Sequence, residues 1–371
     1  MLESLHIEGF RKYKDFTFNG FNRITFILGE NNVGKTSALE AIYTWACGQN
    51  TFPFPGLPLS RGRYVNFQAP FWVMEELLSI AYDRRNMPIH MVFDGIYDGR
   101  TERFEHIIRP SDLLMQFDSS YKNSIEKPTI ITNNYTQNQL ILPSGLAATL
   151  IAEWDIAHNG NKPEKGLLTV PYASTQNVQS PIMAKFIDLL SYISVQETVQ
   201  MYARLKREGL LDEVVKEMQG VFPEIKGFDM IPYPDGSQAP VSIENKDGNY
   251  LPLYAYGDGV QKWFYIFGAL TMFKQSIICI DEVDTGFHPD AQTDFCVSMM
   301  QTAIRNDVQL FLTTHNIEFI DNVLNTVVKC PELAESVSVI TMRNTNDGLR
   351  TRNLSAKEAL NAREIYNMEL R

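Results

Sequence analysis

The segment from Arg23 to Tyr43 constrains the fold more than any other part of the chain. It reads RITFIL, GENNVGKT and SALEAIY in succession. The first part is an apolar and β-branched run typical of a buried strand, and the last part has the spacing of a helix. The loop between them fits the pattern G-x-x-x-x-G-K-[ST], whose backbone N–H groups surround phosphate oxygens. This strand–loop–helix order predicts an α/β fold with an anion site at the helix N-terminus.

The loop also predicts a binding site for a nucleoside triphosphate. Lys35 is expected to reach the β and γ phosphates, and the Thr36 hydroxyl is expected to hold Mg²⁺. The residues that we expect to contact ATP are Gly29, Glu30, Asn31, Asn32, Val33, Gly34, Lys35, Thr36 and Ser37. A chance glycine turn is the alternative interpretation, and the flanking strand and helix disfavour it.

A second part of the site is predicted in SIICIDEVDTGFHP, residues 276–289. A strand buried on both faces delivers the residues after it to the carboxyl edge of the sheet, where ligands bind. Asp281 is expected to bind Mg²⁺, directly or through water. Glu282 is expected to accept a proton from the attacking water. An exposed acidic turn is the alternative, and the phosphate loop elsewhere in the chain weakens it.

His315 follows another apolar run, in the sequence QLFLTTHN. A histidine at the end of that strand can contact the γ-phosphate and the attacking water, because imidazole titrates near neutral pH and has two ring nitrogens. A lone histidine is more often structural. Its position after Asp281 and Glu282 favours a catalytic role.

The stretch YGDGVQKWF places a glycine-rich turn just before the acidic strand. Gly257, Asp258 and Gly259 are expected to open a helix near Val260, whose free N–H groups form another anion site. Two anion sites far apart in sequence indicate that each serves a different nucleotide in a dimer. A tight glycine turn without a ligand is the alternative.

Composition limits the classes of protein to which this chain can belong. The chain has 371 residues, is 44% hydrophobic and carries a net charge of −11. This charge argues against constitutive, sequence-independent binding of nucleic acid, which depends on neutralising phosphates with Lys and Arg. It leaves a local basic groove open, and small basic groups occur at Arg61/Arg63, Arg84/Arg85 and Arg204/Lys206/Arg207, where solvated surface charge is the simpler interpretation.

The sequence also predicts where in the cell the protein is found. No run approaches the length of a transmembrane helix, and the N-terminus lacks the pattern of a signal peptide. The four scattered cysteines, at positions 47, 279, 296 and 330, are expected to be reduced and mostly buried. We therefore expect a cytoplasmic protein without membrane contact.

The order of elements along the chain predicts one ATPase head, 1–371, made of four parts. Residues 1–50 hold three strands and the helix after the phosphate loop, and 51–175 read as a β-rich lobe in which MVFDGIYDGR resembles a hairpin with an Asp-Gly turn. Residues 176–225 contain helical runs that begin at 182 and resemble a short arm or lid. Residues 226–371 alternate strand and helix as in a parallel sheet, and end with a helix that Ser355 and Glu358 open as a capping box.

Four motifs now stand in order: GENNVGKT, YGDGVQ, IICIDEVDTGFHP and TTHN. Together they resemble the ABC-type ATPases of the group that contains RecF, the SMC proteins and the OLD ATPases. The acidic motif and the opening GFRKY are especially similar to standalone OLD-like AAA ATPases of prokaryotic phage-defence gene clusters. The resemblance covers nearly the whole chain, although residues 50–225 carry little specific signal. It implies an ABC-ATPase head with a mixed or parallel sheet, an antiparallel β lobe and a short helical insertion.

The resemblance also implies roles for particular residues. It implies a head-to-tail homodimer, or a higher oligomer, that holds two ATP molecules between the phosphate loop of one chain and Gly257–Gly259 of the other. Residues 284–288 would resemble the loop that crosses the dimer seam, and Arg11 in GFRKY is counted with the nucleotide-binding residues. Gly257 stands where the family usually has a serine, which removes a hydroxyl donor to the γ-phosphate. Gln176 is a weak candidate for the glutamine that usually links the lobes.

Several members of this group are disfavoured by the sequence. A long SMC-like tether needs heptads, and the segment between Thr36 and Asp258 has many prolines and no sustained heptads. The acidic motif disfavours a transporter subunit. Only 56 residues follow His315, too few for an appended Toprim nuclease domain. We expect an ATP-driven sensor or scaffold that acts with a separately encoded effector, a nuclease or toxin, in phage defence. The alternative is a RecF-like repair or recombination ATPase that clamps DNA when ATP is bound.

Overall fold

A computed structural model describes residues 1–49, 73, 77–83, 87–110, 139–141, 147–170, 182–231, 239–286 and 289–364. The chain divides into two compact units. Unit 1 comprises Met1–Glu3, Phe18–Ala46 and Ile182–Arg371. Unit 2 comprises Ser4–Thr17 and Cys47–Pro181. Each unit thus gathers segments that are distant in sequence.

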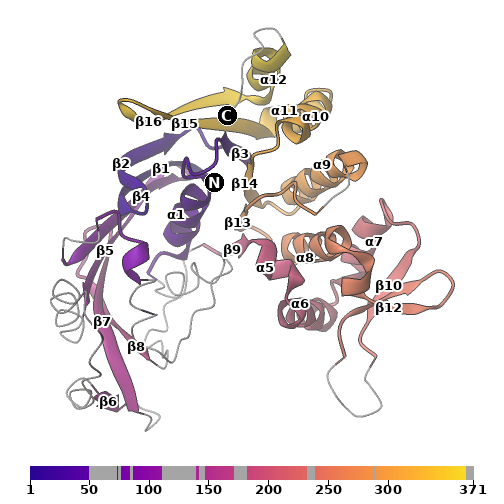
Figure 1. Ribbon diagram of the computed structural model, residues 1–371, viewed down its shortest axis with the longest axis horizontal. Coiled ribbons are helices and arrows are strands. Elements are labelled where there is room, and N and C mark those ends of the chain that lie inside the picture. Colours follow the sequence, from indigo (N-terminus) through magenta and orange to yellow (C-terminus); the bar gives the residue numbers. More distant parts are fainter. Residues whose placement is uncertain are drawn as a thin grey trace, which may run out of the picture. The chain divides into compact units, whose positions relative to one another are not determined.

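Unit 1 is built on a six-stranded sheet whose strand order is β16-β15-β3-β14-β13-β9. The strands are β3 (Ile24–Gly29), β9 (Ala184–Ile187), β13 (Ile277–Ile280), β14 (Gln309–Thr314), β15 (Val337–Thr345) and β16 (Gly348–Ser355) (Figure 1). Strands β9, β13, β14, β3 and β15 are parallel, and β16 is antiparallel to β15. Every residue of β3, β13 and β14 is buried, as expected for a parallel sheet covered on both faces.

Unit 1 also contains helices, of which all except α1 share one hydrophobic core with this sheet. They are α1 (Lys35–Cys47), α5 (Leu189–Ile193), α6 (Val195–Glu208), α7 (Leu211–Gln219), α8 (Asp258–Met272), α9 (Pro289–Arg305), α10 (Ile317–Val327), α11 (Pro331–Ser336) and α12 (Ala356–Glu364). A 3₁₀ turn, η1 (Leu253–Tyr256), precedes α8. The predicted α/β class with a parallel phosphate-loop sheet is confirmed.

A small antiparallel sheet completes unit 1. Its strands are β10 (Ile225–Asp229), β11 (Ser242–Asn245) and β12 (Tyr250–Pro252). Phe228 of β10 packs against Phe264 of α8, with ring centroids 4.6 Å apart. This sheet therefore extends the core beside the helix that the glycine-rich turn opens.

The prediction that the first helical run begins at 182 is wrong. Residues Ala184–Ile187 form β9, which pairs in parallel with β13, and α5 begins only at Leu189. A strand partner distant in sequence overrides the local helical pattern here. Helix α6 then buries Leu205 and neighbouring side chains in the core of unit 1, so it is packed along its inner face. Movement of this segment as an arm or lid stays a prediction.

Unit 2 is an antiparallel sheet with the strand order β2-β1-β4-β5-β7-β6, to which β8 adds by pairing with β7. The strands are β1 (Leu2–Phe10), β2 (Tyr13–Asn19), β4 (Ile89–Tyr97), β5 (Arg100–Pro110), β6 (Gln139–Ile141), β7 (Ala147–His158) and β8 (Glu164–Val170). Asp98 and Gly99 connect β4 to β5, both with positive φ, at 47° and 71°. This two-residue turn is the predicted Asp-Gly hairpin, and its twist matches that of the strands.

The start of the last described helix, α12, agrees with the capping box predicted from the sequence. The backbone N–H of Ser355 donates to Glu358 Oε2 at 2.8 Å, and the N–H of Glu358 donates to Ser355 Oγ at 3.3 Å. The predicted capping box therefore opens α12. The four cysteines are free, and those at 47, 279 and 296 are buried, as predicted.

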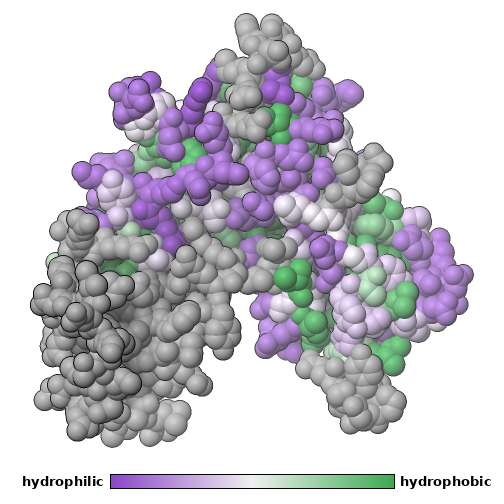
Figure 2. Space-filling model, viewed as in Figure 1, coloured by the Kyte–Doolittle hydropathy of each residue, from purple (hydrophilic) through white to green (hydrophobic). Residues whose placement is uncertain are grey.

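Among the residues that are coloured in Figure 2, hydrophilic ones predominate on the face shown, with smaller hydrophobic areas. Exposed apolar side chains in unit 1 include Met183 before β9, Ile193 at the end of α5 and Val195 at the start of α6. In the described part of the chain, no helix has both the length and the apolar character needed to cross a membrane.

Candidate nucleotide site

The loop between β3 and α1 has the backbone that its glycines predict. Gly29 and Gly34 have φ of 154° and 120°, and Asn32 adopts a left-handed φ of 63°. A Cβ built at Gly29 would lie 2.6 Å from the carbonyl oxygen of Met342 and 2.8 Å from Val33 Cγ1. Any larger residue at position 29 therefore displaces the loop. Val33 is buried and anchors the loop, while residues 30–32 are exposed.

Lys35 lies across the mouth of this loop. Its Nζ donates to the carbonyl oxygens of Gly29 at 2.7 Å and Glu30 at 3.0 Å. Burial lowers the pKa of Lys35, and the charges of Asp281 and Glu282 partly offset that effect. The ammonium is thus held next to the α1 N-terminus, where phosphate groups bind.

Asp281 meets Thr36 although 245 residues separate them. Thr36 Oγ1 donates to Asp281 Oδ2 at 2.9 Å, and Thr313 Oγ1 donates to Asp281 Oδ1 at 2.5 Å. The parallel register of β3, β14 and β13 explains this, since residues after neighbouring parallel strands gather at one sheet edge. The structure thus brings together the two residues predicted to hold the metal.

These two groups fit Mg²⁺. In nucleotide sites Mg²⁺ keeps several waters and is bound by one or two side chains together with substrate phosphates. A hydroxyl and a carboxylate beside a phosphate loop provide that donor set. The described residues hold no cluster of three or more His, Cys, Asp or Glu able to bind a metal.

Glu282 and His315 face each other at the same edge. The distance from His315 Nδ1 to Glu282 Oε1 is 3.8 Å, and the two side chains are about half exposed. Glu282 has a left-handed φ of 49°, and its backbone N–H donates to Thr313 Oγ1 at 2.9 Å. The base and the histidine predicted from sequence are therefore adjacent, open to solvent and next to Asp281.

Lys262 is a contributor that sequence reasoning missed. This lysine of α8 is 1% exposed, and its Nζ donates to Glu282 O at 2.8 Å, Thr285 O at 3.0 Å and Thr285 Oγ1 at 3.1 Å. Burial lowers its pKa to about 7, although Asp284, Glu282 and Asp281 raise it. A single charged residue in the mainly apolar run VQKWFYIFGAL was the available signal, because a buried lysine needs partners.

The glycine-rich turn opens α8 one or two residues earlier than predicted. The helix begins at Asp258, and Gly257 precedes it with a φ of 90° and no side-chain cap. Gly257 and Asp258 are exposed, and a Cβ built at Gly286 would lie 3.5 Å from Asp258 Cβ. The turn therefore packs beside the loop that follows Glu282. Binding of a nucleotide by Gly257, Asp258 and Gly259 stays a prediction.

Other predicted positions are placed differently. Arg11 lies in unit 2, where its Nη1 donates to the carbonyl oxygen and to Oγ of Ser79, each at 3.0 Å. Its nucleotide contact stays a prediction. Gln176 and His288 lie outside the described residues. Asp284, at the start of the loop predicted to cross a dimer seam, is buried and accepts a hydrogen bond from Thr314 Oγ1 at 2.6 Å.

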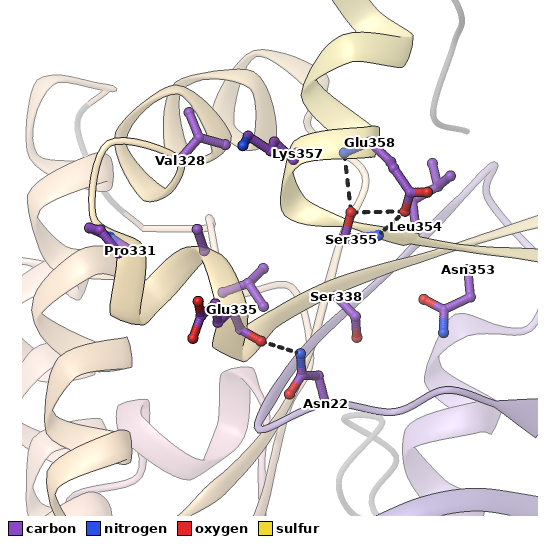
Figure 3. Close-up of a pocket in the computed structure, with 12 residues that line it drawn as sticks. Asn22, Val328, Pro331, Glu335, Ser338, Asn353, Leu354, Ser355, Lys357 and Glu358 are labelled. Atoms are coloured by element: carbon purple, nitrogen blue, oxygen red, sulfur yellow. Dashed lines mark hydrogen bonds between the residues drawn. The ribbon is translucent and has the colours of Figure 1, made fainter.

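A separate cavity of about 650 Å³ lies at the amino ends of β3 and β15, the opposite strand ends from the phosphate loop. Figure 3 shows Asn22 donating to the carbonyl oxygen of Glu335, with Ser355 and Glu358 bonded to each other on the other side. These side chains are already paired with protein groups. The cavity contributes nothing to the nucleotide site.

Two family models match the chain. One, described as "AAA domain", matches residues 4–142, and the other, described as "AAA domain, putative AbiEii toxin, Type IV TA system", matches residues 186–321. The second match contains the glycine-rich turn, the acidic pair and His315. A protein of Helicobacter pylori (strain ATCC 700392 / 26695) named "ATP/GTP phosphatase" is 21% identical over 370 residues, which cover 92% of each chain.

Solved structures are similar over most of the chain. The SMC head domain from Thermotoga maritima has a TM-score of 0.45 at 12% identity and covers 95% of this chain and 99% of its own. An SMC head bound to the C-terminal winged-helix domain of ScpA has a TM-score of 0.47 at 11% identity, with 96% and 99% covered. An SMC head with an extended coiled coil, derived from Pyrococcus furiosus, gives 0.45 at 10% identity, with 99% of each chain covered.

The sheet, the loop and the acidic edge define a P-loop nucleoside triphosphatase. The AAA-domain matches and the named phosphatase agree with this class and support an ATPase.

Proposed function

We propose that the chain hydrolyses ATP with Mg²⁺ as a head-to-tail dimer. The carrying observation is the hydrogen bond from Thr36 to Asp281 at 2.9 Å, with Lys35 and the facing Glu282 and His315 at the same sheet edge. A phosphate loop, a metal pair and a base are the parts that phosphoryl transfer to water requires. The phosphatase name of the Helicobacter relative supports the same reaction.

In the proposed reaction, each residue at this sheet edge has a separate role. Lys35 and the loop N–H groups hold the phosphates, and Thr36 and Asp281 hold Mg²⁺, which neutralises phosphate charge when bound. Glu282 accepts the proton of the attacking water as oxygen bonds to the γ-phosphorus and the bond to the leaving β-phosphate oxygen breaks. His315 lies beside this carboxylate and contacts the γ-phosphate and the water.

The dimer is proposed from the exposed turn at the start of α8. The first N–H groups of a helix are unpaired, and no side chain caps this helix. In the proposed dimer, Gly257–Gly259 of one chain contact the γ-phosphate held by Lys35 of the other. Gly257 offers backbone N–H alone, where the resembling family usually has a serine hydroxyl.

We further propose that this dimer is a cytoplasmic sensor or scaffold that controls a separately encoded effector in phage defence. The OLD-like form of the acidic motif supports this role. The description of the family model over residues 186–321, which names a toxin, also supports it. Co-purification of native operon products identifies the effector.

Glu282→Gln tests the proposed mechanism. It removes the base while keeping a side chain of similar size, so hydrolysis should slow by about 10²-fold or more with ATP still bound. Because ATP then persists between two chains, sedimentation should show a larger assembly with ATP than for the wild type with ADP.

Two further variants help to show whether the proposed dimer or the proposed base is wrong if Glu282→Gln does not behave as expected. Glu208→Gln makes the same charge change at an exposed position of α6 and should behave as wild type. Lys35→Ala should lose tight ATP binding. A monomeric Glu282→Gln protein with ATP bound would refute the dimer, whereas wild-type turnover would refute the base. Strong activation by double-stranded DNA would instead favour the RecF-like alternative.

A further inference from the structure

Asp188 lies directly beside Asp281. Strands β9 and β13 are parallel, and Ile187 is the register partner of Ile280. The next residue on each strand is an aspartate, and the backbone N–H of Asp281 donates to the carbonyl oxygen of Ile187 at 3.0 Å. Neighbouring strands are about 4.8 Å apart, so the two aspartates emerge side by side at the carboxyl edge.

The two oxygens of the Asp188 carboxylate have different surroundings. Oδ1 accepts hydrogen bonds from the backbone N–H of Ser191 at 2.8 Å and from Ser191 Oγ at 2.7 Å. Oδ2 is buried and has no hydrogen-bond partner, and the residue is only 6% exposed. Helix capping of α5 explains Oδ1 but leaves Oδ2 unexplained, since buried polar atoms are nearly always paired.

The electrostatics of the pair call for a positive neighbour. Burial raises the pKa of Asp188, the bonds from Ser191 oppose this, and the charge of Asp281 raises it further. Two carboxylates this close repel unless a cation or a donor lies near both. Asp281 accepts hydrogen bonds from the neutral hydroxyl groups of Thr36 and Thr313, and its charge also interacts with Lys35 and Lys262. No cation is among the groups that shift the pKa of Asp188 most.

We propose that Asp188 is a second acidic group of the metal–nucleotide site, which rests on the proposed ATPase function. Its Oδ2 accepts a hydrogen bond from water bound to the Mg²⁺ that Thr36 and Asp281 hold. Asp188 thereby orients the hydration shell of the metal and is a positioning residue. The edge strand β9 is thus a part of the site.

Asp188→Asn gives the direct test. Asparagine caps helices as well as aspartate, so α5 keeps its cap while the charge is lost. We expect the affinity for Mn²⁺, measured by electron paramagnetic resonance with a non-hydrolysable ATP analogue, to fall about 10- to 100-fold, as for other groups that orient metal ligands. Nucleotide affinity in excess EDTA should stay within about 2-fold, because the phosphate loop is unchanged.

Ser191→Ala is the matched control, because it removes the two hydrogen bonds that Ser191 Oγ makes with Asp188 and keeps the carboxylate. Its Mn²⁺ affinity should stay close to that of the wild type. Unchanged Mn²⁺ affinity in Asp188→Asn would overturn the proposal while leaving the ATPase function intact. Absence of nucleotide binding by the wild type would overturn both.

A measurement on the wild type covers the case in which Asp188→Asn fails to fold. A crystal structure with Mn²⁺ and the analogue should show an Asp188 oxygen bonded to a metal-bound water. A hydration shell that does not reach Asp188 would overturn the proposal.

Discussion

A histidine in the core of unit 2 shows how burial restricts the protonation of a side chain. His106 of unit 2 is fully buried, and burial lowers its pKa to about 3. Its Nδ1 accepts a hydrogen bond from Trp154 Nε1 at 3.2 Å, which requires the ring to be neutral at that nitrogen. A second proton, on Nδ1, would charge the ring and break this hydrogen bond, so the folded core of unit 2 disfavours it.

This histidine predicts how stability depends on pH. Its folded pKa lies below the unfolded value of about 6.5, so the unfolded chain binds a proton first as pH falls. Stability is intact above about pH 6.5 and falls toward pH 3 by up to about 1.4 kcal/mol per pH unit. Urea unfolding of unit 2 between about pH 7.5 and pH 5 measures this slope. His106→Phe should flatten it, and an equal slope in that variant would contradict the assignment.

At the level of elements, the side chain of Lys262 joins α8 to the loop after β13. Lys262 donates to the carbonyl oxygens of Glu282 and Thr285, both in the loop that carries the proposed base. Glu282 itself has a left-handed backbone, which needs support from its surroundings. Through these hydrogen bonds, helix α8 helps to set the orientation of the Glu282 carboxylate relative to the phosphate loop.

Lys262→Met should reduce kcat about 10-fold or more while ATP binding changes little. Methionine fills a similar volume but leaves two loop carbonyls without their donor, and small displacements of a catalytic group reduce rates strongly. Steady-state kinetics together with nucleotide binding measure the two effects separately. Lys274→Met, at an exposed lysine beyond the same helix, is the control. An equal loss of binding and turnover would indicate a damaged fold.

Local elements of this fold were predictable and distant pairings were not. The strand, loop and helix around Lys35 and the turn at Asp98 are encoded by neighbouring residues, and the structure has them as predicted. Strand β9 owes its conformation to β13, about 90 residues later, so its helix-like pattern misled. The proposed role of Asp188 depends on that same pairing, so no local pattern indicated it. Lys262, in contrast, stands out locally as the single charged residue of the mainly apolar run VQKWFYIFGAL.

The whole molecule consists of two units with separate cores and separate sensitivities. The predicted ligand groups Lys35, Thr36 and Asp281 all belong to unit 1, whereas His106 belongs to unit 2. A ligand that binds only the folded form stabilises what it binds. The two units are therefore expected to respond to different solution conditions.

Calorimetry should separate the two responses. With a non-hydrolysable ATP analogue and Mg²⁺ at about 100 times Kd, unit 1 gains about 2.7 kcal/mol, a rise in Tm of roughly 5–10 °C for a unit of this size. Acidification should lower the transition of unit 2. Lys35→Ala should abolish the first shift and keep the second. A single transition that moves as a whole would show that the units unfold together.

The order of strands in unit 1 has a consequence for synthesis on the ribosome. Strand β3 is buried on both faces between β14 and β15, yet its first partner begins at Gln309, about 285 residues after Ile24. At roughly 5–20 residues per second, that partner emerges about 15–60 s later. During this interval the nascent chain exposes an apolar strand with two unpaired edges, and the nucleotide loop is translated long before the sheet that shapes it exists.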